Sequence, residues 1–457
     1  MPSPFSNRLL LSLCLLVAAS SAVASAQTFT TLYNFNGKDG AFPYYVTLAQ
    51  GRDGDLYGTT GGDASPGGTV FRITSQGALS LYSFNGANGS TPEASLVLGT
   101  DGLLRGTTTA GGSSNDGVVF SIGPQSPIAV VLNFDGTNKK YPLTPLTLSV
   151  DGNYYGTTEE GGTHQFGTVY KLTPSGSVTV LHSFSSLTQP TGGLVYGPDH
   201  AFYGDAYYGG PGNQGTVFRV TPSNIATIYY FTGPINSGPE GSLVLANDGN
   251  FYGVTAAGDF GLGSVFRLDP TGTLTVLHSF DGTDGEYPFA GLIQATDGNL
   301  YGTTFVSNAF GDGTIFSITT DGAFTSLYTF HTTDGAGPFG LMQHTNGKIY
   351  GVTSYGGTLK GCGIGGCGTV FSLDMGLGPF IKFVLPFGQV GSGVQILGTG
   401  LTGATTVTFN GVTAPTFAVA SDTGMVAMVP AGATTGPVQV TTPGGTLTSN
   451  VNFQILP

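Results

Sequence analysis

The chain has 457 residues, of which 9% are charged and 77 are glycine, and its formal net charge at pH 7 is −13. An acidic chain with few basic residues lacks the positive footprint that nucleic acids and anionic membrane surfaces require, so neither is expected as a partner. The glycines do not follow the third-residue period of collagen, which leaves turn formation as their main role.

Residues 1–26 form a separate segment with the features of a secretory signal peptide. Arg8 supplies a positive charge, an apolar run covers residues 9–19, and the segment ends in Ala-Ser-Ala. This tripeptide is typical of a signal-peptidase site, so cleavage is expected after Ala26. A membrane anchor is the alternative, but the apolar run is shorter than the ~20 residues that a spanning helix needs. We therefore expect a protein that is secreted to the extracellular space or the cell surface, with no membrane span after cleavage.

From residue 27 to residue 375 the sequence repeats one motif, written DGNLYGTT in its copy at 297–304. Seven copies place a central glycine every 48 to 50 residues: Gly58, Gly106, Gly156, Gly204, Gly253, Gly302 and Gly351. So constant a period is typical of tandem structural units, and it outranks an estimate of domain number from chain length.

Each repeat is predicted to contain four short antiparallel strands, named A to D in chain order. In the repeat around Gly253, strand-like apolar runs stand at 241–247, 250–255, 263–268 and 274–280. An Asp-Gly turn separates the first two, and Asp-Gly between apolar runs is a strong hairpin signal. The spacing of apolar residues that marks a helix is not found in any stretch. Four strands per unit of about 49 residues are typical of a β-propeller blade.

The number of strands predicts a closed ring. A D-like strand at 30–35 precedes the first complete repeat, while the last C strand, at 368–373, has no D strand after it. The N-terminal strand would complete the seventh blade and remove the exposed edges of an open array. An open solenoid is the alternative, and it leaves both unmatched strands unexplained. We predict an all-β fold, a seven-bladed β-propeller closed by an N-terminal strand.

The pattern "LYGTT…GG…GTVF…G…LYSF" resembles the GloVer tandem repeat of exported bacterial proteins, and all seven units match it over residues 28–375. The fourth unit departs most, with "YGDAYYGG" for "YGTTxxGG", and Arg105 replaces a tyrosine in the second. The resemblance implies export and a repeat fold, and it implies no chemistry.

Residues 376–457 follow a different pattern, with "GTGL", "VTFNG", "VPAGATTG" and "VTTPGG". This segment resembles a TIG domain, an immunoglobulin-like β-sandwich, which on exported bacterial proteins usually acts as a spacer or contact module. The expected domains are thus a signal peptide (1–26), the propeller (27–375) and the immunoglobulin-like domain (376–457). No surface anchor follows the last strand-like run, so simple secretion is expected.

Two short segments raise the question of a crosslink or a metal. Cys362 and Cys367 remain after cleavage of the leader, and in an oxidising compartment a disulfide between them is expected rather than a metal site. The segment "DGTDGEYP" brings Asp281, Asp284 and Glu286 close in sequence, which makes calcium an alternative to a simple turn. Their spacing is not that of an EF-hand, so no cofactor is expected.

Alternating strand direction places the B–C and D–A loops of every blade on one face of the ring. These loops are longer and more varied than the A–B and C–D turns, and variable loops on a rigid scaffold are a usual place for a binding site. The alternative for each residue of these loops is that it differs from the repeat only through sequence drift in a solvent-facing loop and has no binding role. The predicted ligand-binding residues depart from the repeat pattern on this face: Glu159, Glu160, His164, Asp205, Tyr207, Tyr208, Asp259, Phe260, Phe305 and Asn308.

Catalytic signatures such as G-x-S-x-G, H-E-x-x-H and Walker A are not found in the sequence. His182 and His278 occupy a tyrosine position of strand D, so they are expected to be structural. We predict a monomeric, secreted binding or adhesion protein, not an enzyme, whose loop face recognises a glycan or a cell-surface protein. One alternative is a polysaccharide-active glycosidase or lyase, which would need carboxylates gathered at the ring centre. The other is a structural component of the envelope or matrix.

Overall fold

The computed structural model describes most of the chain from residue 27 onward: residues 27–62, 67–136, 140–186, 188–221, 224–232, 237–307, 311–359, 361–363 and 365–457. Within these residues every regular element is a β-strand, which confirms the all-β prediction. The predicted signal peptide and Asn308 lie outside the described residues. In the described ranges we find no helix with the length and hydropathy of a membrane span.

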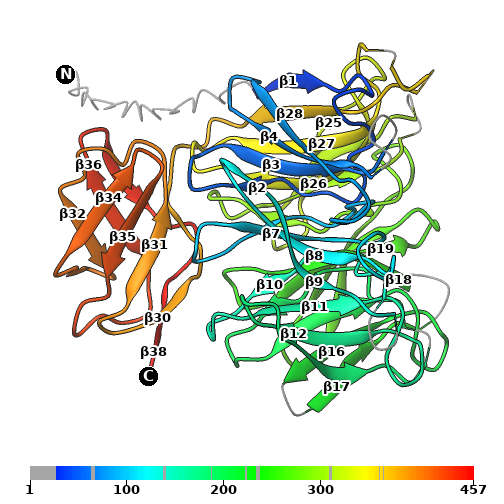
Figure 1. Cartoon of the computed structure of the whole chain (residues 1–457), viewed down its shortest axis with the longest axis horizontal. Coiled ribbons are helices and arrows are strands. Elements are labelled where there is room, and N and C mark those ends of the chain that lie inside the picture. The colour runs from blue at the N-terminus through cyan, green and yellow to red at the C-terminus, as the bar shows by residue number, and fades with distance from the viewer. Residues whose placement is uncertain are drawn as a thin grey trace, which may run out of the picture.

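The described part of residues 28–374 holds seven antiparallel four-stranded sheets (Figure 1). The first three sheets follow the chain order: β2 (Ala49–Gln50), β3 (Leu56–Thr60), β4 (Thr69–Ile73) and β5 (Leu79–Ser83); β6 (Val97–Leu98), β7 (Leu104–Thr108), β8 (Val118–Gly123) and β9 (Ser126–Asn133); β10 (Thr147–Leu148), β11 (Tyr154–Thr158), β12 (Thr168–Leu172) and β13 (Val178–Ser183).

The next three sheets repeat this arrangement: β14 (Val195–Tyr196), β15 (Phe202–Ala206), β16 (Thr216–Thr221) and β17 (Asn224–Tyr230); β18 (Ser237–Leu245), β19 (Phe251–Ala257), β20 (Ser264–Leu268) and β21 (Leu274–Ser279); β22 (Ile293–Gln294), β23 (Leu300–Thr304), β24 (Thr314–Ile318) and β25 (Phe324–Thr329). In each sheet the four strands correspond to A, B, C and D of one repeat.

The seventh sheet joins the two ends of the repeat region. It consists of β26 (Ala336–Gln343), β27 (Ile349–Tyr355), β28 (Thr369–Asp374) and the N-terminal strand β1 (Thr28–Asn34). β1 pairs with β28, with Thr28 opposite Asp374 and Asn34 opposite Thr369. β1 therefore takes the place that strand D has in the other six sheets, and the two strands lie side by side at the top of Figure 1.

The central glycine of each repeat is required by a close aromatic contact. A Cβ atom added to Gly253 would lie 2.5 Å from Cζ of Phe266, and one added to Gly58 would lie 2.4 Å from Cζ of Phe71. The same contact with the aromatic ring of strand C recurs in all seven sheets. Because these rings are buried, the glycine makes room for the core of each sheet.

The aspartate of the Asp-Gly turn also accepts a hydrogen bond from the hydroxyl of a tyrosine in strand B. The hydroxyl of Tyr252 donates to Asp248 at 2.7 Å, and the same bond recurs in most of the other sheets. In the second sheet Arg105 replaces the tyrosine and donates to both carboxylate oxygens of Asp101, at 3.0 and 2.6 Å. The repeated aspartate therefore has a structural role besides hairpin geometry.

A proline in each D–A loop connects neighbouring sheets. In the second loop, the N–H of Thr91 donates to the carbonyl of Gly67 in the preceding sheet at 2.9 Å, and the carbonyl of Thr91 accepts from Thr109 at 3.1 Å. A positive φ before proline is strained for a residue with a side chain, because such a residue prefers an extended conformation with negative φ. The hydrogen bonds to the two neighbouring sheets therefore stabilise a backbone conformation that is unfavourable by itself. All seven residues before the proline have this φ: Phe42, Thr91, Tyr141, Gln189, Gly238, Tyr287 and Gly337.

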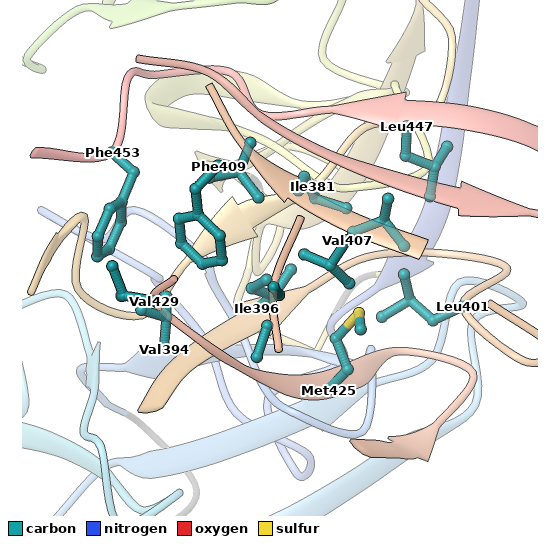
Figure 2. Close-up of a cluster of buried hydrophobic side chains, with 14 of the residues drawn as sticks. Ile381, Val394, Ile396, Leu401, Val407, Phe409, Met425, Val429, Leu447 and Phe453 are labelled. Atoms are coloured by element: carbon teal, nitrogen blue, oxygen red, sulfur yellow. The ribbon is translucent and has the colours of Figure 1, made fainter. Parts of the chain in front are cut away.

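The tail forms two four-stranded sheets and one short strand pair: β29 (Lys382–Phe383), β31 (Gly393–Leu397), β35 (Gly424–Met428) and β34 (Phe417–Ser421); β33 (Val412–Thr413), β32 (Thr406–Phe409), β36 (Val438–Thr442) and β37 (Gly445–Thr448); β30 (Phe387–Gln389) and β38 (Gln454–Leu456). Ile396 and Met425 of one sheet and Val407 and Phe409 of the other share a buried apolar cluster (Figure 2). The tail thus has a core of its own.

The tail covers one end of the repeat region (Figure 1). The hydroxyl of Thr423 donates to the carbonyl of Arg52 in an A–B turn at 2.7 Å, and the rings of Phe387 and Tyr196 lie 5.1 Å apart. A cavity of about 480 Å³ lies between A strands of several sheets and tail residues such as Phe383 and Leu397. The tail therefore lies on the side of the A–B turns and leaves the B–C and D–A loops uncovered.

Replacing Gly253 by alanine is expected to lower the free energy of unfolding by about 1–3 kcal/mol, because the new methyl group overlaps the buried ring of Phe266. Gly378→Ala is the matched control: Gly378 is exposed and has open space around its Cα, so its effect should stay within about 0.5 kcal/mol. Urea unfolding followed by circular dichroism measures both. Equal effects of the two substitutions would contradict the steric account of the repeated glycine.

Candidate functional site

A cavity of about 420 Å³ opens where the D–A loops of the seven sheets converge, and we call it the axial cavity. Every one of these loops contributes to its lining, through Tyr44, Ser95, Leu143, Thr191, Glu240, Phe289 and Phe339 among others. B–C loop residues Tyr207 and Tyr208 line it as well. The cavity therefore lies on the face that the sequence predicts for binding, opposite the tail.

One side of the axial cavity is aromatic. The ring of Phe339 lies 4.8 Å from that of Tyr44, 5.2 Å from that of Tyr45 and 5.6 Å from that of Phe305. Phe289 extends this cluster through a contact of 5.6 Å with Phe305. Tyr45 is 46% exposed and has a φ of 58°, an unfavourable conformation for a bulky residue. Exposed rings held in strained backbone are found more often at binding sites than elsewhere.

The other side is acidic. Asp205 stands where most repeats have the first threonine of YGTT, and it is 1% exposed. The hydroxyl of Thr191 lies 3.3 Å from Asp205 Oδ1 and 3.0 Å from the carbonyl of Pro239, so it is placed to donate to either oxygen. Burial raises the pKa of Asp205 to about 7, while burial and the nearby charge of Asp205 raise the pKa of Glu240 to about 8. Neither carboxyl has an ion-pair partner in the described chain.

Two further carboxyl groups lie near this mouth. Glu93 follows the proline of the second D–A loop, the same position that Glu240 has in the fifth. Burial and the charge of Glu159 raise the pKa of Glu93, and burial followed by the charge of Glu160 raises that of Glu159. The charges of Glu93 and Glu240 both act on Tyr45. The acids thus form two interacting pairs, Asp205 with Glu240 and Glu93 with Glu159, and one member of each pair acts on Tyr45.

Five of the predicted residues gather at this mouth. Glu159, Tyr207 and Phe305 occupy one equivalent position, directly after strand B, and Asp205 and Tyr208 adjoin Tyr207. The rings of Tyr207 and Phe305 pack against the glycine before the next loop's proline, as the close approach of Tyr207 to Gly238 shows. The B–C loops thus form an outer layer around the D–A loops.

The other predicted residues lie outside the axial cavity. Glu160 pairs with Lys140 at 3.0 Å, and His164 contacts the hydroxyl of Thr163 at 3.0 Å. Asp259 accepts a hydrogen bond from Ser279, and its neighbour Phe260 is 65% exposed. These residues do not line the cavity.

The calcium alternative is not supported by the structure. Asp284 is 2.7 Å from Nε2 of His278, and Asp281 accepts from Thr283, so both carboxylates serve their own loop. The equivalent bond of Asp334 with Tyr328 shows that the contact belongs to the repeat. A search of the described residues finds no group of three His, Cys, Asp or Glu side chains that could hold a metal, and this excludes Asp281, Asp284 and Glu286 as such a group. Cys362 and Cys367 form a disulfide.

The sequence interpretation missed the residues after the repeated prolines. They are Tyr44, Glu93, Leu143, Thr191, Glu240, Phe289 and Phe339. The signal was present, because a proline recurs in every D–A loop with the period of the repeat, and the position after it varies more than its surroundings. A comparison of the repeats with one another at that position would have found the cavity lining.

Small sheets arranged so that their loops meet at one cavity define an all-β protein of the β-propeller-like class. The Gloeobacter/Verrucomicrobia repeat matches residues 20–196 and 189–427, and the chain belongs to this family. A search of curated proteins finds no match to the sequence.

Two solved structures illustrate the likeness of fold. PorZ, a bacterial surface component of the type-IX secretion system of Porphyromonas gingivalis, is 11% identical with a TM-score of 0.50, and the match covers 93% of this chain and 60% of PorZ. The PQQ-bound aldose sugar dehydrogenase of Streptomyces coelicolor is 14% identical with a TM-score of 0.42, and the match covers 76% of this chain and 98% of that one. At such identities the likeness concerns the fold alone.

Asp205→Asn is expected to stabilise the protein at pH 8.5 by roughly 2–4 kcal/mol and to have little effect at pH 4. The folded-state pKa of Asp205, about 7, lies above its ordinary value of 3.8, so between these values the folded state binds more protons than the unfolded state. Stability of the unsubstituted protein therefore falls as pH rises through this interval, and a shift of about 3 units sets the upper limit at ~4 kcal/mol.

Urea unfolding at both pH values measures this gain. Asp259→Asn, which changes an exposed carboxyl, is the control and should show no gain at pH 8.5. If Asp205→Asn instead destabilised the protein at pH 8.5, the ionised carboxylate would have to be favourably paired, and the description of the acidic side would be wrong.

Proposed function

We propose that this protein is exported and binds a glycan in the axial cavity without chemically changing it. We also propose that the seven sheets are the blades of one closed propeller and that the tail is an immunoglobulin-like TIG domain. The pairing of β1 with β28 supports closure of the ring, and the apolar cluster between the two tail sheets supports a sandwich. The leader at residues 1–26 supports export.

The observation that carries the glycan proposal is the division of the axial cavity into an aromatic and a polar side. Sugar rings present apolar C–H faces that pack on aromatic rings, while their hydroxyl groups bond to polar side chains. Tyr44 and Tyr45 offer the first kind of surface, and Thr191, Ser242 and Glu240 offer the second. The volume of about 420 Å³ falls in the range of about 300–1,000 Å³ that is typical of small-molecule sites.

A polysaccharide-active enzyme is the second candidate, and the coupled carboxyls Asp205 and Glu240 favour it. A carboxyl with a pKa near neutrality suits general acid catalysis. Glycoside hydrolysis, however, typically needs two carboxyls that both reach the substrate. Asp205 is 1% exposed and does not line the cavity, so Glu240 alone of this pair meets a ligand there. Binding is therefore the better-supported function.

The position of the tail suits a spacer. Its contacts are with A–B turns and strand A, on the side opposite the mouth of the axial cavity. A ligand that enters the cavity would not meet the tail. We propose that the tail extends the propeller from its point of attachment and leaves the mouth free for an extracellular glycan.

A glycan-array screen of residues 27–457 tests the proposed function. At least one oligosaccharide is expected to bind, and Tyr45→Ala should weaken that binding by 10-fold or more, because it removes an exposed ring from the aromatic side. Phe260→Ala, which removes an exposed ring outside the cavity, should leave binding within about 2-fold.

Three outcomes would contradict the proposal. Failure of every glycan to bind would rule out a glycan as the ligand. An equal loss in both variants would place the site elsewhere. Cleavage of the bound oligosaccharide, detected by mass spectrometry of the array hit after incubation, would establish the enzymatic alternative.

A further inference from the structure

We infer that the axial cavity selects a cationic glycan, one that carries free ammonium groups such as a glucosamine oligomer, over its neutral N-acetylated counterpart. This inference rests on the proposed function, since it names the class of glycan that the same cavity takes.

The axial cavity has an acidic lining residue and no compensating base. Glu240 lines it, Asp205, Glu93 and Glu159 are further carboxyl groups near the mouth, and the lining contributed by described residues contains no Lys, Arg or His. Lys140 is a basic residue of the adjoining loop, and its amine is already paired with Glu160 at 3.0 Å. A ligand that enters the cavity therefore meets Glu240, a carboxyl group for which the described lining supplies no basic partner.

Asp205 and Glu240 are departures from the repeat that the fold does not require. The position of Asp205 holds Thr or Val in the other six sheets: Thr59, Thr107, Thr157, Val254, Thr303 and Val352. The position of Glu240 holds an aromatic, Leu or Thr in five others, and Glu only at Glu93. The same strands and loops thus form without an acid. Two neighbouring sheets carry acids whose charges interact, and the one that lines the cavity, Glu240, points to a cationic ligand that pairs with it.

The aromatic side suits the same ligand. Cations are attracted to the faces of aromatic rings, and a ring that is partly exposed at a cavity wall leaves its face available. Tyr44, Tyr45 and Phe339 form this wall, and Tyr208 lines the cavity on the acidic side. Burial raises the pKa of Tyr44, Tyr45 and Tyr207, so these hydroxyls stay neutral and do not compete with the carboxyls for the cation.

A ligand with both sugar rings and ammonium groups uses every part of this cavity. Its ring faces pack on Tyr44 and Tyr45, its hydroxyls meet Thr191 and Ser242, and an ammonium group pairs with Glu240. N-acetylation removes the positive charge and leaves the sugar rings unchanged. The two forms of one oligosaccharide therefore separate the charge contribution from glycan binding itself.

Isothermal titration calorimetry at pH 6.5 tests the inference with the glucosamine trimer and the N-acetylglucosamine trimer, on residues 27–457. Because burial and the charge of Asp205 raise the pKa of Glu240 to about 8 in the free protein, pairing with an ammonium group at this pH releases the proton of the carboxyl. The glucosamine trimer is expected to bind at least 10-fold more tightly. Glu240→Gln should reduce this preference to within about 3-fold, through a loss of affinity for the glucosamine trimer alone. Glu160→Gln, which changes an acid that is already paired outside the cavity, should retain the full preference. Thermal unfolding of each variant establishes that it folds.

The failures of the two proposals can be told apart. Equal or tighter binding of the N-acetylated trimer would overturn the inference and leave glycan binding in place. The same conclusion follows if neither trimer binds while neutral glycans bind on the array. Retention of the preference in Glu240→Gln would also overturn it. If no glycan of either kind binds, the proposed function fails, and this inference fails with it.

Discussion

The pairing of β1 with β28 is the constraint on which the rest of the structure depends. The D–A loops come from seven separate repeats, and they line one cavity only because the sheets surround it. An array without this pairing would leave β28 with a free edge and would have no reason to bring Tyr44 of the first loop against Phe339 of the last. The aromatic side of the cavity lies across this junction. The pairing that joins the two ends of the repeat region therefore also brings together the aromatic residues of the cavity.

The residues that line the cavity can vary among the repeats because the contacts that stabilise each sheet involve other positions. Gly58 and its equivalents fit against buried rings, the Asp-Gly turn satisfies the tyrosine of strand B, and the proline loop connects each sheet to the one before it. These contacts involve positions that are nearly the same in every repeat. The residue after the proline takes no part in these contacts, and its identity differs among the repeats, from Glu in two of them to Phe in two others. Two unfavourable features, the positive φ of Tyr45 and the buried carboxyl of Asp205, lie at or beside the mouth.

Much of the fold could be predicted from the sequence because its signals are local and repeated. The 49-residue period, the four strands of each unit and the orphan strand at 30–35 are all visible without a structure. The site was harder, because it is defined by convergence in space. Asp205, Tyr207 and Tyr208 were found since they break the repeat within one loop. Glu240 and Tyr44 were missed because the residue after the proline varies so much among the repeats that a single acid or aromatic does not stand out there. The calcium alternative gains no support from the structure, because the carboxylate of Asp284 contacts His278, a partner that lies six residues earlier and that spacing alone does not assign.

The central claim is that a desolvated acid pair and an aromatic wall together form a site for a positively charged sugar. A crystal structure of residues 27–457 with the glucosamine trimer tests it most directly. We predict an ammonium nitrogen within about 4 Å of a carboxylate oxygen of Glu240, with a sugar ring packed on the face of Tyr45 or Tyr44. A trimer bound on the outer loops near Phe260, or one in the axial cavity with its ammonium groups directed into solvent, would contradict the account.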